Sequence, residues 1–516
     1  SKKAGGQVPE YPRQELPDAT KWDHTKWSPN YRNDNRIETH ESGTAPCKTA
    51  CPAHVAVQGY LKLAAQGRYD EALALIKREN PLPAICGRVC NRRCEDACTR
   101  GRVDAAVAID EVKKFIAQRD LDAATRYVPP VVTPTRAGGF DQKIAIIGAG
   151  PAGLSCAFYL AEKGYKPVVF EKNERPGGML TYGIPSFKLE KDVIEAEVEV
   201  IRLMGAEFRY GVEVGRDVTL DELRAQGFKA FYVAIGCQGG RLAGIPGEDA
   251  EDVTVAVDFL REVNSGKIDA LPGRTIVVGG GNVAMDVARN ACRLGSEHVE
   301  MFCLESEAQM PASEEERREA VEDGAHISCG WGPKEVHLDE AGRVCGITFK
   351  RCTRVFDDEG RFAPEYDEND LRRVDADRVV MSIGQSIVWG DLLAGSKVEL
   401  GRGQGALADP QTYQTAEPDI FVGGDVYTGP SFAIDAIAAG HEAAVSIHRF
   451  VQPGSTLTIG RNQRYYTALD RDDVVIESYD NASREVAHVD RDREKAAPFS
   501  EYVETFTEEQ VRAETA

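Results

Sequence analysis

The sequence predicts an α/β protein with two Rossmann-like dinucleotide-binding domains, one inserted into the other, and an α-helical domain in front of them. A strand, a glycine-rich turn and a helix follow one another from residue 142, and the same pattern returns at 274. This duplication indicates two nucleotide-fold units. Between residues 41 and 125, apolar residues recur at helical spacing, and this segment also holds six cysteines.

The size and charge of the chain exclude several classes of protein. Its 516 residues are too many for a single hydrophobic core, so several domains are expected. A formal net charge of -21 makes nucleic acid an unexpected partner. No apolar run approaches the roughly 20 residues of a membrane-spanning helix, and the first residues lack the apolar core of a secretory signal. We therefore expect a cytoplasmic protein without membrane insertion, whose 13 cysteines are thiols or metal ligands.

Changes in composition along the chain predict where the domains begin and end. Proline- and glycine-rich stretches mark linkers, and the return of short apolar strands after residue 375 marks the second half of a split domain. The predicted units are an extended arm (1–40), a helical domain (41–125), a first nucleotide-binding domain (141–245 and 375–450), a second one (246–374) and a polar tail (451–516).

The first glycine loop has the spacing of a dinucleotide site. Gly148, Gly150 and Gly153 form G-x-G-x-x-G between a strand and a helix. The first glycine permits a tight turn, the second lets a pyrophosphate approach the backbone, and the third lets the helix pack on the strand. Glu171 ends the next strand, where a carboxylate can accept hydrogen bonds from a ribose. The full context favours a dinucleotide site over a merely structural turn.

The second loop repeats this design. Gly279, Gly281 and Ala284 form G-x-G-x-x-A within a strand–turn–helix unit. Two nucleotide sites in one chain indicate electron or hydride transfer between two cofactors. The alternative is a duplicate that no longer binds a nucleotide.

The end of the following strand favours NAD(H) over NADP(H). Leu304 and Glu305 stand where a site for the 2′-phosphate would need arginine. A carboxylate suits the free 2′-hydroxyl of NAD and repels the phosphate of NADP. The alternative is that Glu305 is only solvated and that Arg293 or Arg317 binds a phosphate.

The early cysteines are spaced like ligands of a metal centre, at positions Cys47, Cys51, Cys86, Cys90, Cys94 and Cys98. Thiolates that converge on one point hold iron–sulfur clusters, usually four per cluster, and structural zinc also takes four. An iron–sulfur centre is favoured because the two nucleotide sites suggest electron transfer and zinc carries no electrons. Zinc and inert thiols remain the alternatives.

Several longer motifs connect the chain to a known family: NPLPAICGRVC, GAGPAGL, RPGGMLTYGIPSFKLEK, GGGNVAMDVAR, MPAS, SIGQ and FVGGDVYTGPSFAIDAIAAG. Over about residues 40–450 the chain resembles the small (beta) subunit family of glutamate synthase. This family includes bifurcating transhydrogenase subunits and the N-terminal half of dihydropyrimidine dehydrogenase. The resemblance implies FAD in the first nucleotide fold and NAD(H) or NADP(H) in the second.

The resemblance also implies residue roles. It places Asp425 at the ribityl chain of FAD and points the helix after Gly429 at the flavin, where a positive helix end stabilises negative charge. An ordinary turn is the alternative for this Gly–Gly–Asp sequence. The implied cofactor-binding residues are Gly148, Gly150, Pro151, Ala152, Gly153, Glu171, Lys172, Gly177, Gly178, Met179, Gly183, Ile184, Gly236, Gly279, Gly281, Asn282, Val283, Ala284, Glu305, Gly384, Gly424, Asp425, Ser431 and Ala433.

The chain departs from the family pattern in two places. Family members that use NADP carry Tyr-Arg-Arg where this chain has Cys303, Leu304 and Glu305, which supports NAD(H). Relatives with two four-iron clusters have a C-x-x-C pair upstream of the first cysteine, and this chain has RIETHESGTAP there.

We therefore expect one [4Fe-4S] cluster, with two as the alternative. Its ligands are expected among Cys47, Cys51, Cys90, Cys94 and Cys98, and Cys86 is the least expected ligand. Relatives also use a Gln or Glu ligand at the position of Lys113, so Asp110 or Glu111 is the expected substitute.

The resemblance implies a flavin oxidoreductase that transfers electrons between NAD(H) and iron–sulfur centres, with no catalytic side chain. Its expected partners are other subunits of a redox complex, of the bifurcating hydrogenase, formate dehydrogenase or transhydrogenase type, or a ferredoxin-like acceptor. One alternative is a glutamate synthase small subunit that serves a separate large subunit. An alternative of another class is a non-catalytic nucleotide-binding scaffold. In many relatives a tail like this one continues into a cysteine-rich ferredoxin domain, and two alternatives stay open for this chain: that it does the same, or that it stops short of such a domain.

Overall fold

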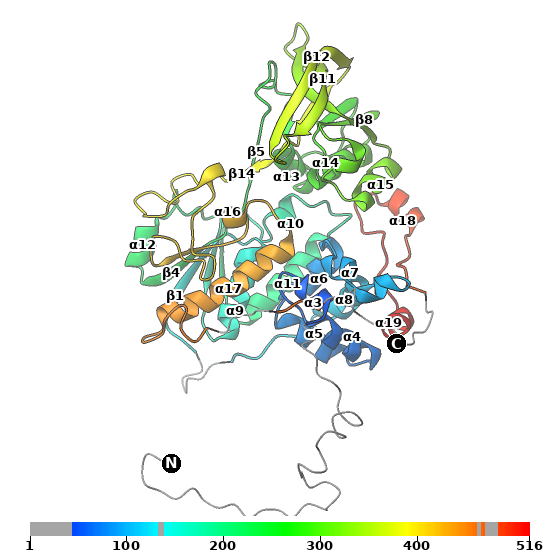
Figure 1. Cartoon of the computed structure of the whole chain (residues 1–516). Coiled ribbons are helices and arrows are strands. Elements are labelled where there is room, and N and C mark those ends of the chain that lie inside the picture. The colour runs from blue at the N-terminus through cyan, green and yellow to red at the C-terminus, as the bar shows by residue number, and fades with distance from the viewer. Residues whose placement is uncertain (1–43, 133–138, 462–465, 470–482) are drawn as a thin grey trace, which may run out of the picture.

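The computed structural model describes residues 44–132, 139–461, 466–469 and 483–516 (Figure 1). The expected arm at residues 1–40 lies outside these ranges. Within them, a helical domain and a first α/β domain lie side by side, and a second α/β domain stands above both (Figure 1). None of the helices described there is both long and apolar enough to cross a lipid bilayer.

The helical domain carries the cysteines. Its α-helices are α3 (Pro46–Thr49), α4 (Val57–Ala65), α5 (Tyr69–Lys77), α6 (Pro83–Val89), α7 (Arg93–Asp96) and α8 (Ile109–Ala117). Helix α6 begins with Pro83, whose fixed φ suits the first turn. The buried Glu197 carboxylate accepts the N–H groups of Ala84 (2.7 Å) and Ile85 (3.0 Å), and burial raises its pKa to about 8. This contact anchors the cysteine-bearing helix to the first α/β domain.

The first α/β domain is a five-stranded sheet in the order β15-β4-β1-β2-β3. The strands are β1 (Lys143–Ile147), β2 (Val168–Glu171), β3 (Glu207–Tyr210), β4 (Phe228–Val233) and β15 (Ile420–Val422), and their pairs are parallel. The helices are α9 (Pro151–Glu162), α10 (Met179–Tyr182), α11 (Lys191–Leu203), α12 (Leu220–Ala225), α16 (Asp425–Thr428) and α17 (Ala433–Val451). Strand β1 lies between β2 and β4, where the chain direction across the sheet reverses and ligands bind.

The second α/β domain has another five-stranded parallel sheet, in the order β6-β13-β7-β8-β9. Its strands are β6 (Val253–Val255), β7 (Arg274–Val278), β8 (His298–Cys303), β9 (His326–Cys329) and β13 (Arg378–Met381). Its helices are α13 (Ala256–Asn264), α14 (Asn282–Arg293) and α15 (Glu314–Glu322). The expected return to the first domain at residue 375 is too early, because β13 still pairs with β6 and β7. The chain crosses between the domains at β5 (Gly239–Gly240) and β14 (Gln385–Ser386), which pair antiparallel.

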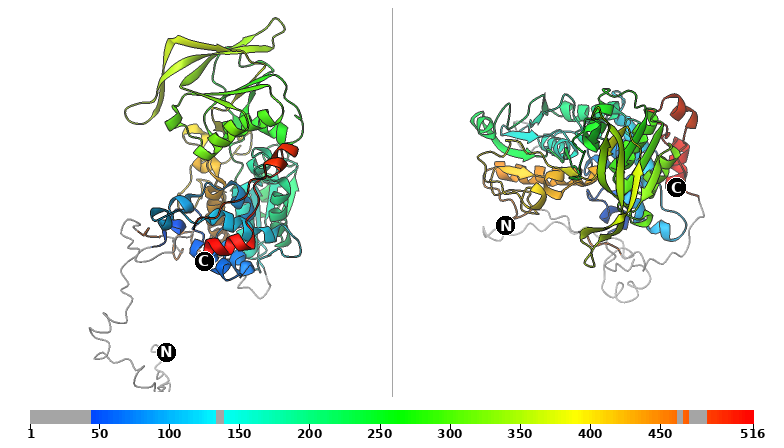
Figure 2. Two further views of the ribbon diagram at one scale, coloured as in Figure 1. Left: turned by 90° about the vertical axis from the view of Figure 1, so that its right-hand side faces the viewer. Right: turned by 90° about the horizontal axis from the view of Figure 1, so that it is seen from above.

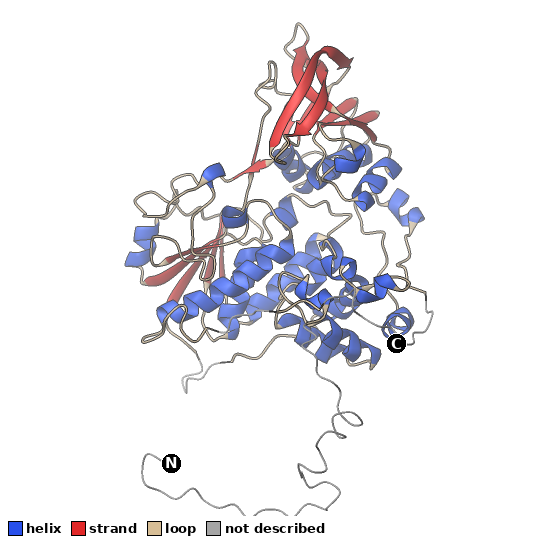
Figure 3. Ribbon diagram, viewed as in Figure 1, coloured by secondary structure: helices blue, strands red, loops and turns tan. Residues whose placement is uncertain are grey.

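Three antiparallel strands project from the second domain (Figures 2 and 3). They are β10 (Trp331–Leu338), β11 (Val344–Phe356) and β12 (Phe362–Val374). Phe349 of β11 stacks on Phe302 of β8 with a centroid distance of 3.9 Å, so the antiparallel sheet covers one face of the parallel one.

The C-terminal segment, expected as a polar tail, is folded against two domains. It contains α18 (Arg491–Ala496) and α19 (Glu508–Thr515). Arg293 of α14 pairs with Glu494 (2.7 Å), and Lys114 of α8 pairs with Glu501. Because Tyr502, Phe506 and Val511 are buried, the segment links the second α/β domain to the helical domain by packing as well as by charge.

Candidate cofactor sites

The first glycine loop is shaped for close backbone approach. Gly148 has a φ of 105°, and a Cβ there would lie 2.5 Å from the carbonyl oxygen of Ala234. A Cβ at Gly153 would lie 1.9 Å from the carbonyl oxygen of Gly148, so this glycine allows α9 to pack on the loop. A Cβ at Gly150 would have no atom within 4 Å. The open space at Gly150 fits a pyrophosphate beside the N-terminus of α9.

Glu171 stabilises this loop at the end of β2. Its side chain is 3% exposed and accepts the N–H groups of Ala149 (2.8 Å) and Asn173 (2.9 Å). A cavity of about 140 Å³ opens beside it. The predicted residues that line this cavity are Gly148, Gly150, Pro151, Ala152, Glu171, Gly178, Met179, Ile184, Gly236, Gly424, Asp425, Ser431 and Ala433. A smaller adjoining cavity of about 50 Å³ adds Lys172.

Three of the residues predicted to bind the first cofactor line neither of these two cavities. Gly153, Gly177 and Gly183 are absent from the lining of these two cavities. Gly153 serves helix packing, and Gly177 has a φ of 106° and donates its N–H to the carbonyl of Ala149 (2.8 Å). Gly153 and Gly177 shape the loop that the cavity lies against.

Asp425 closes the cavity at the first turn of α16. It accepts the N–H of Ser431 (3.2 Å), and burial raises its pKa to about 6. The N-terminus of α17 follows at Ala433, so a carboxylate and a helix end face the same space. A polar acceptor and a positive helix end suit the ribityl hydroxyls and the pyrimidine edge of a flavin.

We predict that two glycine substitutions separate cofactor binding from folding. Gly150→Ala adds a methyl group to open space, so it should change the free energy of unfolding of the flavin-free protein by less than about 0.5 kcal/mol. It should still lower the amount of FAD bound per chain, because the methyl group occupies the space expected for the pyrophosphate. Gly153→Ala meets a backbone carbonyl and should also lower stability, by about 1–3 kcal/mol. Flavin content per chain and chemical denaturation measure both effects; full FAD in Gly150→Ala would contradict the assignment.

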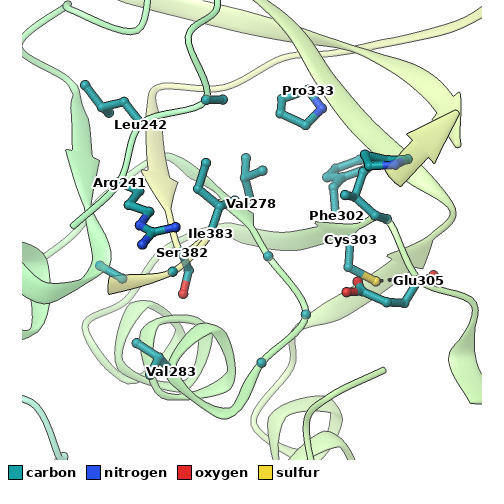
Figure 4. A pocket seen from close by; sticks show the side chains of 18 of the residues that line it. Arg241, Leu242, Val278, Val283, Phe302, Cys303, Glu305, Pro333, Ser382 and Ile383 are labelled. Atoms are coloured by element: carbon teal, nitrogen blue, oxygen red, sulfur yellow. Dashed lines mark hydrogen bonds between the residues drawn. The ribbon is translucent and has the colours of Figure 1, made fainter. Parts of the chain in front are cut away.

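The second loop borders a larger cavity of about 840 Å³ (Figure 4). Gly279 has a φ of 141°, and a Cβ there would lie 2.2 Å from the carbonyl oxygen of Ser382. The predicted residues Gly279, Gly281, Val283, Glu305 and Gly384 line the cavity. Two others do not: Ala284 is fully buried in the core, and Asn282 lines a different cavity described below.

Glu305 lies at the end of this cavity beside Cys303, across from Arg241 and Ile383 (Figure 4). The two arginines considered as phosphate ligands are engaged elsewhere. Arg293 is buried and pairs with Asp323 and Glu494, and Arg317 donates to the carbonyl of Glu307. Neither belongs to the lining.

Sequence reasoning missed Arg241 and Lys350, which also line the large cavity. Arg241 follows the crossing strand β5, and Lys350 comes from the projecting strand β11. Lys350 pairs with Glu368 (2.7 Å). No local pattern marks these residues, because long-range packing brings them to the nucleotide loop.

The cysteines lie on or next to α3, α6 and α7; α3 packs against α7, and both α6 and α7 pack against α8. Burial raises the pKa of the Cys90 and Cys94 thiols, and both have Cys51 as an electrostatic neighbour. Burial also raises the pKa of Cys47, and the neighbouring Cys98 adds to this rise. Cys86 is buried within α6, with its Sγ 3.9 Å from Oδ1 of Asn80.

This donor set fits a cluster better than a single ion. Over the described ranges, no group of three or more His, Cys, Asp or Glu side chains is arranged around one ion position. A four-iron cluster binds each thiolate at a separate iron. A group of partly buried thiols therefore has the right chemistry for it.

A third cavity, of about 620 Å³, lies between the three domains. Cys90 and Asn91 line it from the helical domain, Ser431 and Ala433 from the expected flavin side, and Asn282 from the second glycine loop. Ser431 and Ala433 also line the 140 Å³ cavity beside the first glycine loop. The cysteine loop and the N-terminal end of α17 thus share one space.

The fold and these sites define a pyridine nucleotide-dependent flavin oxidoreductase. Residues 142–440 match the family described as pyridine nucleotide-disulphide oxidoreductase, and the chain belongs to this family. Residues 38–125 match dihydropyrimidine dehydrogenase domain II, 4Fe-4S cluster. The expected family resemblance, fold class and oxidoreductase class are confirmed. Membership implies FAD and a pyridine nucleotide as cofactors.

Curated relatives extend this result. The chain is 35% identical to the beta subunit of an NADP(+)-dependent formate dehydrogenase of Moorella thermoacetica, over 90% of this chain and 68% of that protein. It is 36% identical to the small chain of glutamate synthase [NADPH] of Escherichia coli, over 80% of this chain and 89% of that protein. It is 33% identical to the NAD-dependent dihydropyrimidine dehydrogenase subunit PreT of Escherichia coli O157:H7, over 79% of this chain and 91% of that protein.

A solved structure shares the fold. FprA from Mycobacterium tuberculosis superposes with a TM-score of 0.53 at 19% identity, over 60% of this chain and 85% of that chain. At this identity the match supports the α/β architecture alone.

Proposed function

We propose that this chain transfers electrons between NAD(H) and one [4Fe-4S] cluster through FAD, as a subunit of a larger redox complex. The shared 620 Å³ cavity is the observation that carries this proposal, because residues of all three expected sites line it. In such a protein FAD supplies the link between two-electron hydride transfer and one-electron transfer. The chain supplies binding, orientation and charge.

Named residues would hold each group. The N-terminus of α9 and Glu171 would bind the adenosine half of FAD, and Asp425 would accept a hydrogen bond from its ribityl chain. The open space at Gly281 would receive the pyrophosphate of the nucleotide. Cluster ligands would come from Cys47, Cys51, Cys90, Cys94 and Cys98, with Cys51, Cys90 and Cys94 as the central three.

NAD(H) is the proposed nucleotide. The Glu305 carboxylate lies in the cavity, where it would accept a hydrogen bond from the ribose 2′-hydroxyl and repel a 2′-phosphate. Relatives are named for both nucleotides: the formate dehydrogenase subunit for NADP(+), PreT for NAD. Because the relatives' names include both nucleotides, the proposal rests on Glu305, whose carboxylate favours NAD(H).

A partner complex is proposed from the relatives' names. Formate dehydrogenase and NADPH-Fe(3+) oxidoreductase relatives are both named as beta subunits. The chemistry of the cluster site suits a one-electron carrier as the partner. Purifying the native complex and identifying the subunits that co-elute with this chain would identify the partner.

The absorbance spectrum of the anaerobically purified protein tests the proposal. We expect flavin peaks with a broad iron–sulfur shoulder, about four iron atoms per chain, and bleaching by NADH faster than by NADPH. A colourless protein would instead support a non-catalytic scaffold. Faster bleaching by NADPH would refute the assignment of the nucleotide alone.

A further inference from the structure

Two cysteines lie opposite each other at the ends of neighbouring strands in the second α/β domain. Cys303 ends β8 and Cys329 ends β9, and the parallel register pairs them directly. Their Sγ atoms are 3.8 Å apart. Neighbouring strands are about 4.8 Å apart, and the Cα atoms of disulfide-bonded cysteines are roughly 4.4–6.8 Å apart. The two strands therefore hold these thiols within reach of a disulfide.

The pair borders the proposed nucleotide site. Cys303 lines the cavity of about 840 Å³ beside Glu305 (Figure 4), whereas Cys329 is not part of the lining. A Cβ at Gly280, the middle glycine of the second loop, would lie 2.9 Å from Cβ and 3.5 Å from Sγ of Cys303. The same Cβ would lie 3.1 Å from a carboxylate oxygen of Glu305. Cys303 and Glu305 thus pack together against the glycine loop.

The thiol of Cys303 also supports the backbone at Glu305. Its Sγ lies 3.6 Å from the carbonyl oxygen of Glu305, where an S–H group donates a weak hydrogen bond. The N–H of Gly330, the residue after Cys329, donates to the same oxygen (3.0 Å). A disulfide would remove the S–H donor and bring the two Sγ atoms to roughly 2.0 Å. Its formation would therefore withdraw the sulfur of Cys303 from both Glu305 and the glycine loop.

We propose that Cys303 and Cys329 form a redox-sensitive pair whose disulfide weakens nucleotide binding at the Glu305 end of the cavity. The oxidant is a low-molecular-weight disulfide, such as glutathione disulfide. This inference rests on the proposed function, in which the ribose of the nucleotide lies beside Glu305. Because the effects of two coupled equilibria on each other are reciprocal, bound nucleotide should also protect the pair from oxidation.

The reaction is an exchange of thiols and disulfides. Cys329 is partly exposed, and burial raises the pKa of the Cys303 thiol, so Cys329 is the sulfur that attacks first. Its thiolate forms a mixed disulfide with one half of the oxidant and releases the other half as a thiol. The sulfur of Cys303 then displaces the second half. Overall, the protein thiols lose two electrons and two protons, and the oxidant takes up both to become two thiols.

Anaerobic treatment of the holoenzyme with glutathione disulfide, with and without NAD⁺, tests the proposal. After alkylation and proteolysis, mass spectrometry should find a peptide that links Cys303 to Cys329, and NAD⁺ should slow its formation. The KM for NADH in flavin bleaching should rise about fivefold or more on oxidation. Dithiothreitol should return it to the starting value.

The decisive variant is Cys329→Ser, which cannot form the bond and changes no residue of the cavity lining. Its KM should match that of the reduced wild type and should not respond to the oxidant. Damage to the iron–sulfur site would affect both proteins equally. If Cys329→Ser does not fold, Cys329→Ala takes its place, since it keeps an apolar side chain near the sulfur of Met310. Cys345→Ser is the matched control and should respond as the wild type does, because Cys345 lies on β11 near the carbonyl of His337.

Absence of the linked peptide, or a linked peptide without a change in KM, would overturn the inference. An equal rise of the KM in Cys329→Ser would do the same. The KM is measured with NADH and with NADPH, so the effect is seen with either nucleotide. A wild-type flavin that neither nucleotide bleaches would refute the proposed function, and the peptide map with and without NAD⁺ would still test the thiol pair.

Discussion

Replacing Cys90 or Cys94 with serine is expected to remove the iron–sulfur centre and leave flavin reduction by NADH intact. Serine lacks the thiolate that binds iron, and both thiols belong to the partly buried group near Cys51. We expect iron content and the paramagnetic signal of the reduced cluster to fall to background. Bleaching of FAD by NADH should stay within a few-fold of wild type, because the nucleotide and flavin cavities do not use these thiols.

The matched control for this prediction is Cys345→Ser. Cys345 lies on β11 in the projecting sheet, with its Sγ 3.5 Å from the carbonyl oxygen of His337. Its loss should leave iron content unchanged. A Cys90→Ser protein with full iron content would show that the cluster is held elsewhere.

The double substitution Leu304→Arg and Glu305→Arg is expected to invert nucleotide preference. It removes the carboxylate that repels a 2′-phosphate and adds guanidinium groups that bind one. A charge-assisted contact of this kind contributes about 1.5–3 kcal/mol. A free-energy difference of about 1.4 kcal/mol corresponds to a tenfold change in an equilibrium or rate constant. The ratio of kcat/KM for NADPH to that for NADH should therefore rise about 100-fold or more.

Anaerobic flavin reduction with each nucleotide measures this ratio. Glu307→Arg is the control, because Glu307 is exposed two residues further on and does not line the cavity. It should leave the ratio within about twofold, as expected for a screened surface charge. An unchanged ratio in the double variant would mean that Glu305 does not contact the ribose.

Local sequence patterns predicted the parts of the sites that depend on local backbone geometry. The loop glycines were predictable because Gly148 and Gly279 need a positive φ, and Gly153 needs room for a carbonyl. The positions of Glu171 and Glu305 were predictable because Glu171 ends, and Glu305 closely follows, the strand next to its glycine loop.

The parts that depend on distant contacts were not predictable. Lys350 reaches the nucleotide cavity through an antiparallel sheet whose pairing no short pattern specifies. The boundary at residue 375 was misplaced because β13 resembles any short apolar strand until its partners β6 and β7 are known. The C-terminal segment was predicted to be a polar tail because the residues that it buries, such as Tyr502 and Val511, are few and widely spaced in the sequence.

The order of reduction in a single anaerobic turnover tests the electron path most directly. The holoenzyme is mixed with NADH, flavin absorbance is followed by stopped flow, and samples are freeze-quenched for the paramagnetic signal of the cluster. We expect flavin bleaching first and the reduced-cluster signal afterwards, with the second step absent in Cys90→Ser. A flavin that bleaches fully while the cluster of the wild-type protein stays oxidised would contradict electron transfer through this chain.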